Sequence, residues 1–256
     1  MQKKHEFKEI LVSHFNKQGN KAFEGYGSSS FLKSWQEPYL YMEKYFNSKN
    51  LEDCNFLDYC CGTGVHSIYP AKLGAQVTGI DFSSSSIESA VERAKFFNVE
   101  DKCQFLLQDA EESISFRERF DFIICVQSLL YLDLSETFKK LSKLLTDQGE
   151  LIIIESVAGN YFFDLNRIKN VKNISPKFSS SLNKLHSKEI INNAEKSFKI
   201  LKEDYFGFTT TISYLIERKF KVTIFNEFFF GLDYLLKKIP FLKKYFFTML
   251  IILKKI

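Results

Sequence analysis

Two glycines and two acidic residues near the start of the chain have the types and spacing to bind a nucleoside. Asp58 precedes Gly62 by four residues, Gly64 follows after one residue, and Asp81 lies seventeen residues beyond Gly64. An apolar strand that ends in a Gly-x-Gly turn lets the backbone pass close to a ligand, because glycine has no Cβ. The helix after the turn directs free N–H groups at that ligand, and a carboxylate ending the next strand can accept from both ribose hydroxyls. The pattern predicts a nucleoside-binding α/β domain.

Two features of the turn distinguish the nucleosides that such a domain binds. A dinucleotide fingerprint requires a third small residue in Gly-x-Gly-x-x-Gly and prefers no charge before the first glycine. Here Ser67 holds the third position and Asp58 precedes the turn. This acidic-x-x-x-Gly-x-Gly pattern, residues 58–64, resembles motif I of the class I S-adenosylmethionine (SAM) methyltransferases. SAM has a sulfonium but no phosphate, so a carboxylate beside the loop is favourable. A nicotinamide-dependent Rossmann oxidoreductase is the alternative.

The resemblance implies SAM as the cofactor and assigns roles to individual residues. Asp81 is expected to hold the ribose, and Asp109, after the third strand, is expected to take the adenine amino group. The N-terminal segment 22–35, with Gly and Ser beside aromatic residues, resembles a cofactor cap. Tyr26 and Trp35 are candidate cap or acceptor contacts there, and surface aromatics that anchor a helix are the other interpretation. The complete set of expected cofactor-binding residues is Asp58, Cys60, Gly62, Gly64, Asp81, Phe82, Asp109, Ala110, Gln127 and Tyr26.

Beyond the motif, strand and helix patterns alternate. Residues 102–110 and 120–127 are predicted strands, the second a continuous apolar run typical of a strand covered on both faces. Residues 135–145 have apolar side chains at helical spacing, and 147–149 are expected to turn into a strand at 150–155. Alternation of this kind predicts a mostly parallel sheet with right-handed crossovers. The resemblance covers 50–160 well and implies a Rossmann-like α/β fold, a seven-stranded sheet with helices on both faces and an antiparallel C-terminal strand.

The chain is expected to form one methyltransferase domain over 1–256. Within it we expect an N-terminal helical cap at 1–45, a SAM-binding core at 46–160, and acceptor-side loops, an insertion and a closing strand pair at 161–256. Its 256 residues, 45% of them apolar, suffice for a substantial core. The five cysteines lie on or beside predicted strands without a Cys-x-x-Cys pair, which favours reduced thiols. The N-terminus lacks the apolar stretch of a signal peptide, so a cytoplasmic location is expected.

Charge and motifs argue against several partners. The net charge of +4 is modest and the basic residues are dispersed, whereas nucleic-acid binders usually carry a basic stripe or a recognition module. Asp133 alone after the fourth strand does not make a metal site, so no metal is expected. The oligomeric state is not predicted.

The aromatic and basic segment 228–247 has two interpretations. We predict that 199–208 and 247–253 form the closing antiparallel pair of the sheet, with 228–247 as an insertion between them. Peripheral membrane contact through 228–247 remains the alternative, because an interfacial helix combines apolar and basic residues. The apolar stretch from Tyr245 to Leu253 is far shorter than the ~20 residues that a spanning helix needs.

No catalytic residue is identifiable from the sequence. Methyl transfer from SAM depends chiefly on alignment of acceptor, methyl and sulfur. Tyr131, after the fourth strand, is a weak candidate that orients an acceptor, and plain packing is the other interpretation; a tyrosine base is unfavourable at neutral pH. Tyr131, Glu155 and Tyr161 are expected to converge at the acceptor side, and the loop 160–188 to flank it. The predicted function is metal-independent methyl transfer from SAM to an oxygen or nitrogen of a small molecule; a non-catalytic SAM-binding protein is a further alternative.

Overall fold

A computed structural model describes residues 12, 13, 16, 37–112, 116–159, 164, 186–211, 213 and 226–256. The expected contacts Tyr26, Trp35 and Tyr161 lie outside the described residues, as does most of the N-terminal cap and of the loop 160–188. The helical elements are α2 (Glu37–Asn47), α3 (Ile68–Lys72), α4 (Ser84–Phe96), η2 (Glu100–Lys102), η3 (Leu129–Tyr131), α5 (Leu134–Leu144), α8 (Ser187–Ala194), α10 (Asn226–Leu236) and η5 (Pro240–Tyr245).

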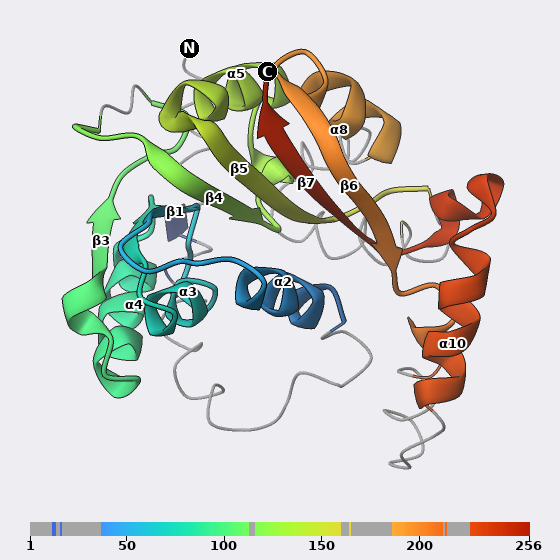
Figure 1. Cartoon of the computed structure of the whole chain (residues 1–256), viewed down its shortest axis with the longest axis horizontal. Coiled ribbons are helices and arrows are strands. Elements are labelled where there is room, and N and C mark those ends of the chain that lie inside the picture. Colours follow the sequence, from blue (N-terminus) through green and yellow to red (C-terminus); the bar gives the residue numbers. More distant parts are fainter. Residues whose placement is uncertain are drawn as a thin grey trace.

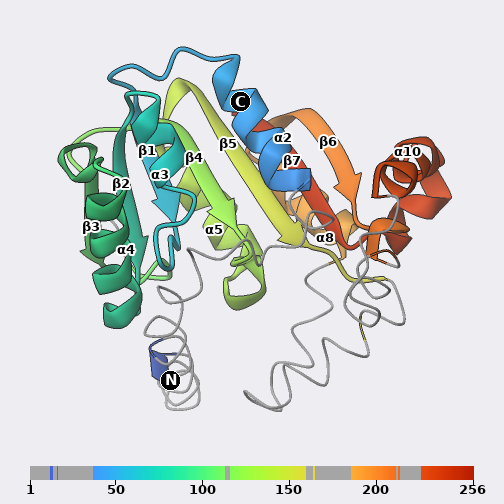
Figure 2. The ribbon, with the colours of Figure 1, turned by 90° about the horizontal axis from the view of Figure 1, so that it is seen from below.

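Seven strands form one sheet in the order β3-β2-β1-β4-β5-β7-β6 (Figures 1 and 2). Neighbours from β3 to β5 run parallel, and β7 is antiparallel to both β5 and β6. The predicted Rossmann-like sheet with its antiparallel C-terminal pair is therefore confirmed. The strands are β1 (Asn55–Tyr59), β2 (Gln76–Asp81), β3 (Cys103–Leu107), β4 (Phe120–Val126), β5 (Leu145–Ser156), β6 (Phe198–Phe206) and β7 (Thr248–Lys255).

The inner strands β1, β4, β5 and β7 are largely apolar on both faces because helices cover both sides of the sheet. Successive residues of one strand point into different hydrophobic cores. Phe56 belongs to the core that contains residues of α2, α3 and α4, whereas the adjacent Leu57 belongs to the core that contains residues of α5 and α8. Figure 1 shows these two helical layers on opposite sides of the strands. Continuous runs such as Ile152–Ile154 need no polar alternation, because each face meets a helix.

Local capping explains where two of these helices begin. The Ser83 hydroxyl accepts from the Ser86 N–H at the start of α4, and the Asp133 carboxylate accepts from the Glu136 N–H at the start of α5. Each side chain satisfies one of the free N–H groups that a first helical turn leaves, which fixes the first residue of the helix. The start of α4 thus falls directly after the strand that carries Asp81.

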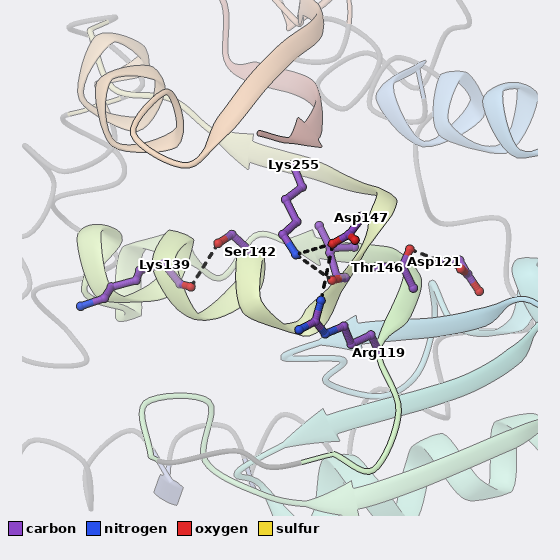
Figure 3. Close-up of polar contacts among 8 residues, drawn as sticks. Arg119, Asp121, Lys139, Ser142, Thr146, Asp147 and Lys255 are labelled. Atoms are coloured by element: carbon purple, nitrogen blue, oxygen red, sulfur yellow. Dashed lines mark hydrogen bonds and ion pairs between the residues drawn. The ribbon is translucent and has the colours of Figure 1, made fainter.

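The predicted strand at 150–155 begins earlier than expected. Strand β5 starts at Leu145, which pairs with Phe120, and regular pairing resumes with Phe122 opposite Glu150. Residues 146–149, which include the predicted turn at 147–149, form an irregular stretch of β5 between these two pairs. A Cβ on Gly149 would lie 3.0 Å from the Phe120 carbonyl oxygen, so glycine permits the close approach of this stretch to β4. Figure 3 shows how polar contacts hold this stretch, with the Asp147 carboxylate between Lys255 (3.1 Å) and Arg119 (3.5 Å).

Segments far apart in the chain meet at one edge of the sheet. The register aligns Ser156 of β5, Thr248 of β7 and Phe206 of β6. Because β6 runs in the same direction as β5, its end lies at the edge where β1, β4 and β5 end. The segment between β6 and β7, with α10 and η5, therefore leaves from and returns to this edge. That placement confirms the predicted insertion between the closing strands.

Candidate functional site

The turn after β1 has three residues in the left-handed backbone region. Cys60 has φ +62°, Gly62 +52° and Gly64 +71°. Backbone contacts hold the turn, since the Cys61 N–H donates to Ile80 O (2.8 Å) and the Gly64 N–H donates to Cys61 O (2.9 Å). A left-handed conformation costs a non-glycine residue roughly 1–2 kcal/mol. The turn thus demands at Cys60 a conformation that glycine adopts freely, a feature the sequence did not reveal.

The two glycines of the turn serve different purposes. A Cβ added to Gly62 would meet no atom within 4 Å. A Cβ added to Gly64 would lie 2.8 Å from the Ala90 Cβ and 3.2 Å from the Phe105 ring, so α4 fills that space. Close packing against α4 is therefore a requirement for glycine at Gly64 that the sequence did not reveal, beside its expected place at the cofactor. Gly62 alone has open space beside it.

Asp81 ends β2 with a buried carboxylate aimed at the turn. One oxygen accepts from the Gly62 N–H (3.0 Å) and the other from the Ser83 N–H (2.9 Å). Burial raises the pKa of Asp81, against the lowering effect of these backbone hydrogen bonds, and the charge of Asp109 raises it further. The Phe82 backbone is a third hydrogen-bond donor to this carboxylate. A carboxylate has about four acceptor positions, so Asp81 keeps capacity for one more donor, such as a ribose hydroxyl.

Asp58 lies behind the turn and is 1% exposed. Its carboxylate accepts a hydrogen bond of 2.6 Å from the Ser67 hydroxyl, just before α3. Burial raises the pKa of Asp58 to about 7; the Ser67 bond lowers it and the nearby Asp81 charge raises it. The acidic residue of the motif therefore joins β1 to the start of α3 from within the protein. Ser67, which argued against a dinucleotide in the sequence, is its partner.

Phe82, Asp109 and Ala110 follow the ends of β2 and β3 at the same edge. The Asp109 carboxylate accepts from the Glu111 N–H (2.8 Å), and its charge reaches Asp81. The Ala110 carbonyl oxygen accepts from the Tyr59 hydroxyl (2.6 Å) and the Lys140 ammonium (2.6 Å). The fold therefore brings the expected residues at the ends of β1, β2 and β3 together. From the N-terminal segment, Asn16 reaches this edge too and accepts hydrogen bonds from Ser83 (2.7 Å) and Ser85 (2.8 Å).

Gln127 follows β4 with φ +53°, and its backbone N–H donates to Ile154 O of β5 (2.9 Å). Its side-chain oxygen accepts from the Ser156 hydroxyl (2.6 Å) at the end of β5, and the side chain also hydrogen-bonds Tyr39 of α2. The Tyr39 ring stacks on His66 with centroids 5.0 Å apart. Burial, then the charge of Arg93, lowers the pKa of His66 to about 4, so the imidazole is neutral at physiological pH. Tyr39 connects the edge of the glycine turn with the end of β4, and no sequence motif indicated it.

Glu155 and Tyr131 meet at the ends of β5 and η3. The Glu155 side chain is buried, and its oxygens accept from the Leu129 N–H (2.8 Å) and the Ser156 N–H (2.9 Å). Burial, then the charge of Glu155, raises the pKa of Tyr131 to about 12. The phenol is therefore neutral at physiological pH, which suits a hydrogen-bond donor rather than a base. In the described part of the chain no group of three metal-ligating side chains exists.

Comparison with known proteins identifies the family. The family model described as a methyltransferase domain matches residues 50–223. The chain belongs to this methyltransferase family. Membership confirms the resemblance that residues 58–64 indicated and favours it over the nicotinamide-dependent oxidoreductase. The family implies SAM as the cofactor. The prediction of a SAM-dependent methyltransferase is thereby confirmed at the level of the family.

Individual relatives of this methyltransferase match its core. The putative methyltransferase YqeM of Bacillus subtilis is 33% identical over 135 residues, 51% of this chain and 53% of the relative. The chain spans about half or less of the length of the first curated relatives. Magnesium protoporphyrin IX methyltransferase from Synechocystis with bound SAH has a TM-score of 0.58 at 17% identity, covering 97% of this chain and 99% of that chain. Geranyl diphosphate C-methyltransferase from Streptomyces coelicolor has a TM-score of 0.59 at 13% identity, covering 90% and 88%.

Proposed function

We propose that this methyltransferase transfers the methyl group of SAM to an oxygen or nitrogen of a small molecule, without a metal ion, in the cytoplasm. The observation that carries the proposal is the Asp81 carboxylate, held by the backbone N–H groups of Gly62 and Ser83 at the glycine turn, together with the open space beside Gly62. SAM, when bound, supplies a methyl group on a sulfonium, which is already activated for in-line displacement. The protein's remaining tasks are to bind, to align and to exclude water.

The residues of the glycine turn and of the following strand ends divide these tasks. Asp81 holds the ribose with the acceptor capacity that its backbone donors Gly62, Ser83 and Phe82 leave, and Asp109 takes the adenine amino group. Phe82 and Ala110 line the same place, and Gln127 reaches it from β4. Asp58 and Cys60 fix the path of the turn, one through Ser67 and one through its backbone conformation.

The acceptor lies, in this proposal, at the ends of β4 and β5. Ligands of open α/β sheets bind outside the carboxyl ends of the strands. Tyr131 there keeps its proton, so it orients a hydroxyl acceptor by donating or accepting a hydrogen bond. An amine needs only a neutral lone pair and desolvation. Carbon is the competing acceptor class, as in the geranyl diphosphate C-methyltransferase, and an acceptor screen separates it from oxygen and nitrogen.

The deciding experiment measures SAM binding and product formation separately. Calorimetry with SAM and with NADH tests the ligand, and Asp81→Ala is expected to weaken SAM binding by about 1.5–3 kcal/mol, the scale of a charged hydrogen-bond partner. Asp147→Ala, a carboxylate at the opposite edge of the sheet, is the matched control and should bind SAM as the wild type does. Unchanged SAM affinity in a folded Asp81→Ala protein would remove the assignment. SAM binding without turnover, over sugars, phenols, amines and lipid headgroups, would favour the non-catalytic alternative.

A further inference from the structure

One surface of the molecule has apolar side chains where a helix normally has polar ones. Helix α10 and the turn η5 after it lie beyond the edge strand β6 (Figures 1 and 2). Phe228 is 65% exposed, Leu235 59% and Phe241 70%. Together with three neighbours they form what we call the α10 outward face: Phe228, Tyr234, Leu235, Lys238, Ile239 and Phe241.

The opposite side of α10 explains why these side chains point outward. Asp233 is 2% exposed and accepts hydrogen bonds from the backbone N–H groups of Phe208, Thr209 and Thr210, as well as from both threonine hydroxyls. Lys237, one turn further, forms an ion pair of 2.8 Å with Asp204 of β6. A surface helix ordinarily turns its charges to water and its apolar stripe to the core. In α10 the acidic residue faces the protein. Its contacts fix the orientation of the helix about its own axis, and the apolar side chains on the opposite side therefore face outward.

Among the side chains that the structure describes, the charges beside this face are mostly positive. The segment 228–247 contains four lysines and a single acidic residue, the buried Asp233. Lys237 and Lys243 pair with Asp204 and Glu203 of β6. Lys238 and Lys244 instead lie over the rings of Tyr234 (4.4 Å) and Tyr245 (5.0 Å), and no acidic partner is found for them within the described residues. Lysines rimming exposed aromatic and aliphatic side chains are the composition of a helix that lies in a membrane interface.

We propose that the α10 outward face docks on an anionic lipid bilayer. Phe228, Leu235 and Phe241 enter the boundary of headgroups and acyl chains, while Lys238 and Lys244 contact anionic headgroups. A second copy of the chain is the less suitable occupant, because a twofold contact through this face would bring its lysines against their own copies. None of the described helices is long and apolar enough to cross a membrane, so the contact is peripheral.

Docking here has a consequence for the substrate, which rests on the proposed function. The segment that carries α10 runs from the end of β6 to the start of β7, and both points lie at the edge of the sheet where β4 and β5 end. The acceptor side therefore lies at the same edge of the sheet as the docking segment. The structure thus points to an acceptor that is amphipathic and resides in the bilayer.

Vesicle flotation tests the docking directly. The probes are vesicles of phosphatidylcholine alone and vesicles with about one-third phosphatidylglycerol. We expect wild-type protein to float with the anionic vesicles only, and to be released by salt. Leu235→Asp and Phe241→Asp should each weaken partitioning into the vesicles about tenfold or more. Each change places a charge where an apolar side chain would enter the bilayer on docking.

A matched control separates the α10 outward face from general surface hydrophobicity. Phe96 is 69% exposed on α4, at the other end of the sheet, so Phe96→Asp introduces the same change elsewhere and should float like the wild type. No flotation of the wild type, or equal loss in all three variants, overturns the proposal. A dimer in sedimentation equilibrium that Leu235→Asp dissociates, without flotation, also overturns it in favour of a second copy. SAM titration of the same samples keeps the proposed function apart, since SAM binding without flotation leaves that function standing.

Discussion

Two regions of the same sheet edge, the glycine turn after β1 and the ends of β4 to β6, use the same structural device, but only the first shows it in the sequence. At the first region, Asp81 accepts from the Gly62 N–H of the turn and from the Ser83 N–H before α4. At the second, Glu155 accepts from Leu129 and Ser156, and Asp233 from three successive N–H groups before α10. Each buried carboxylate satisfies backbone N–H groups of a neighbouring chain segment and so fixes its position. The difference is that the turn also requires glycine, which leaves a recognisable pattern, whereas the ends of β4 to β6 set no such requirement.

The largest effect is expected where the glycine turn meets α4. Gly64→Val places a branched side chain against Ala90 and Phe105 at a left-handed φ, so we expect a loss of about 3–5 kcal/mol in unfolding free energy. Gly62→Ala faces open space and should cost only about 1 kcal/mol, the strain of its left-handed φ. Urea unfolding of both variants measures the difference. Equal losses of unfolding free energy would contradict the distinction between close packing at Gly64 and open space at Gly62.

The second effect is a dependence of stability on pH that originates at Asp58. Its pKa is about 7 in the folded protein and ordinarily 3.8, so the folded state holds the proton more tightly. The stabilisation is complete below pH ~4 and is lost as the pH rises through ~7, an upper limit of about 4 kcal/mol. Asp58→Asn cannot titrate and keeps an oxygen for Ser67, so its stability should fall less over this range.

The comparison between variants isolates Asp58 from other groups. Burial also raises the pKa of Glu37 to about 7, which contributes a slope of the same sign to every variant that retains Glu37. The exposed Asp147→Asn serves as the control and should follow the wild-type curve. Denaturant unfolding at intervals between pH 4 and pH 8 supplies the data. Parallel curves for wild type and Asp58→Asn would show that this carboxylate does not carry the dependence.

The smallest effect is expected at the acceptor side. If Tyr131 orients a hydroxyl acceptor, Tyr131→Phe should slow single-turnover methyl transfer about 5–10-fold, the equivalent of one neutral hydrogen bond, with unchanged SAM affinity. Transfer to an amine should be nearly insensitive. Tyr234→Phe, on the exposed side of α10, is the matched loss of one hydroxyl and should leave the rate unaltered. A wild-type rate in Tyr131→Phe would assign Tyr131 to packing.

Local pattern predicted most of the sheet because its requirements are local. The apolar runs that became β1, β4 and β5, the helical spacing of α5 and the carboxylate ending β2 all follow from periodicity and turn chemistry. The prediction placed the start of β5 too late, because Leu145 already pairs with Phe120 of β4 before the irregular stretch 146–149. Pairing with a distant strand extends β5 beyond what the local turn composition indicates, and Gly149 fits closely against the Phe120 carbonyl oxygen.

By itself, the sequence determined the fold class, the family and the residues that surround the glycine turn, because glycine conformation and strand periodicity restrict residue type at each position. Only the tertiary structure decided what those residues contact. It showed that Gly64 is required by Ala90, that Asp58 meets Ser67 within the protein, and that Tyr39 stacks on His66. It also decided which side of α10 faces water. The physical reason is that these contacts join elements from different parts of the chain, and complementary packing between them leaves no periodic trace in either segment.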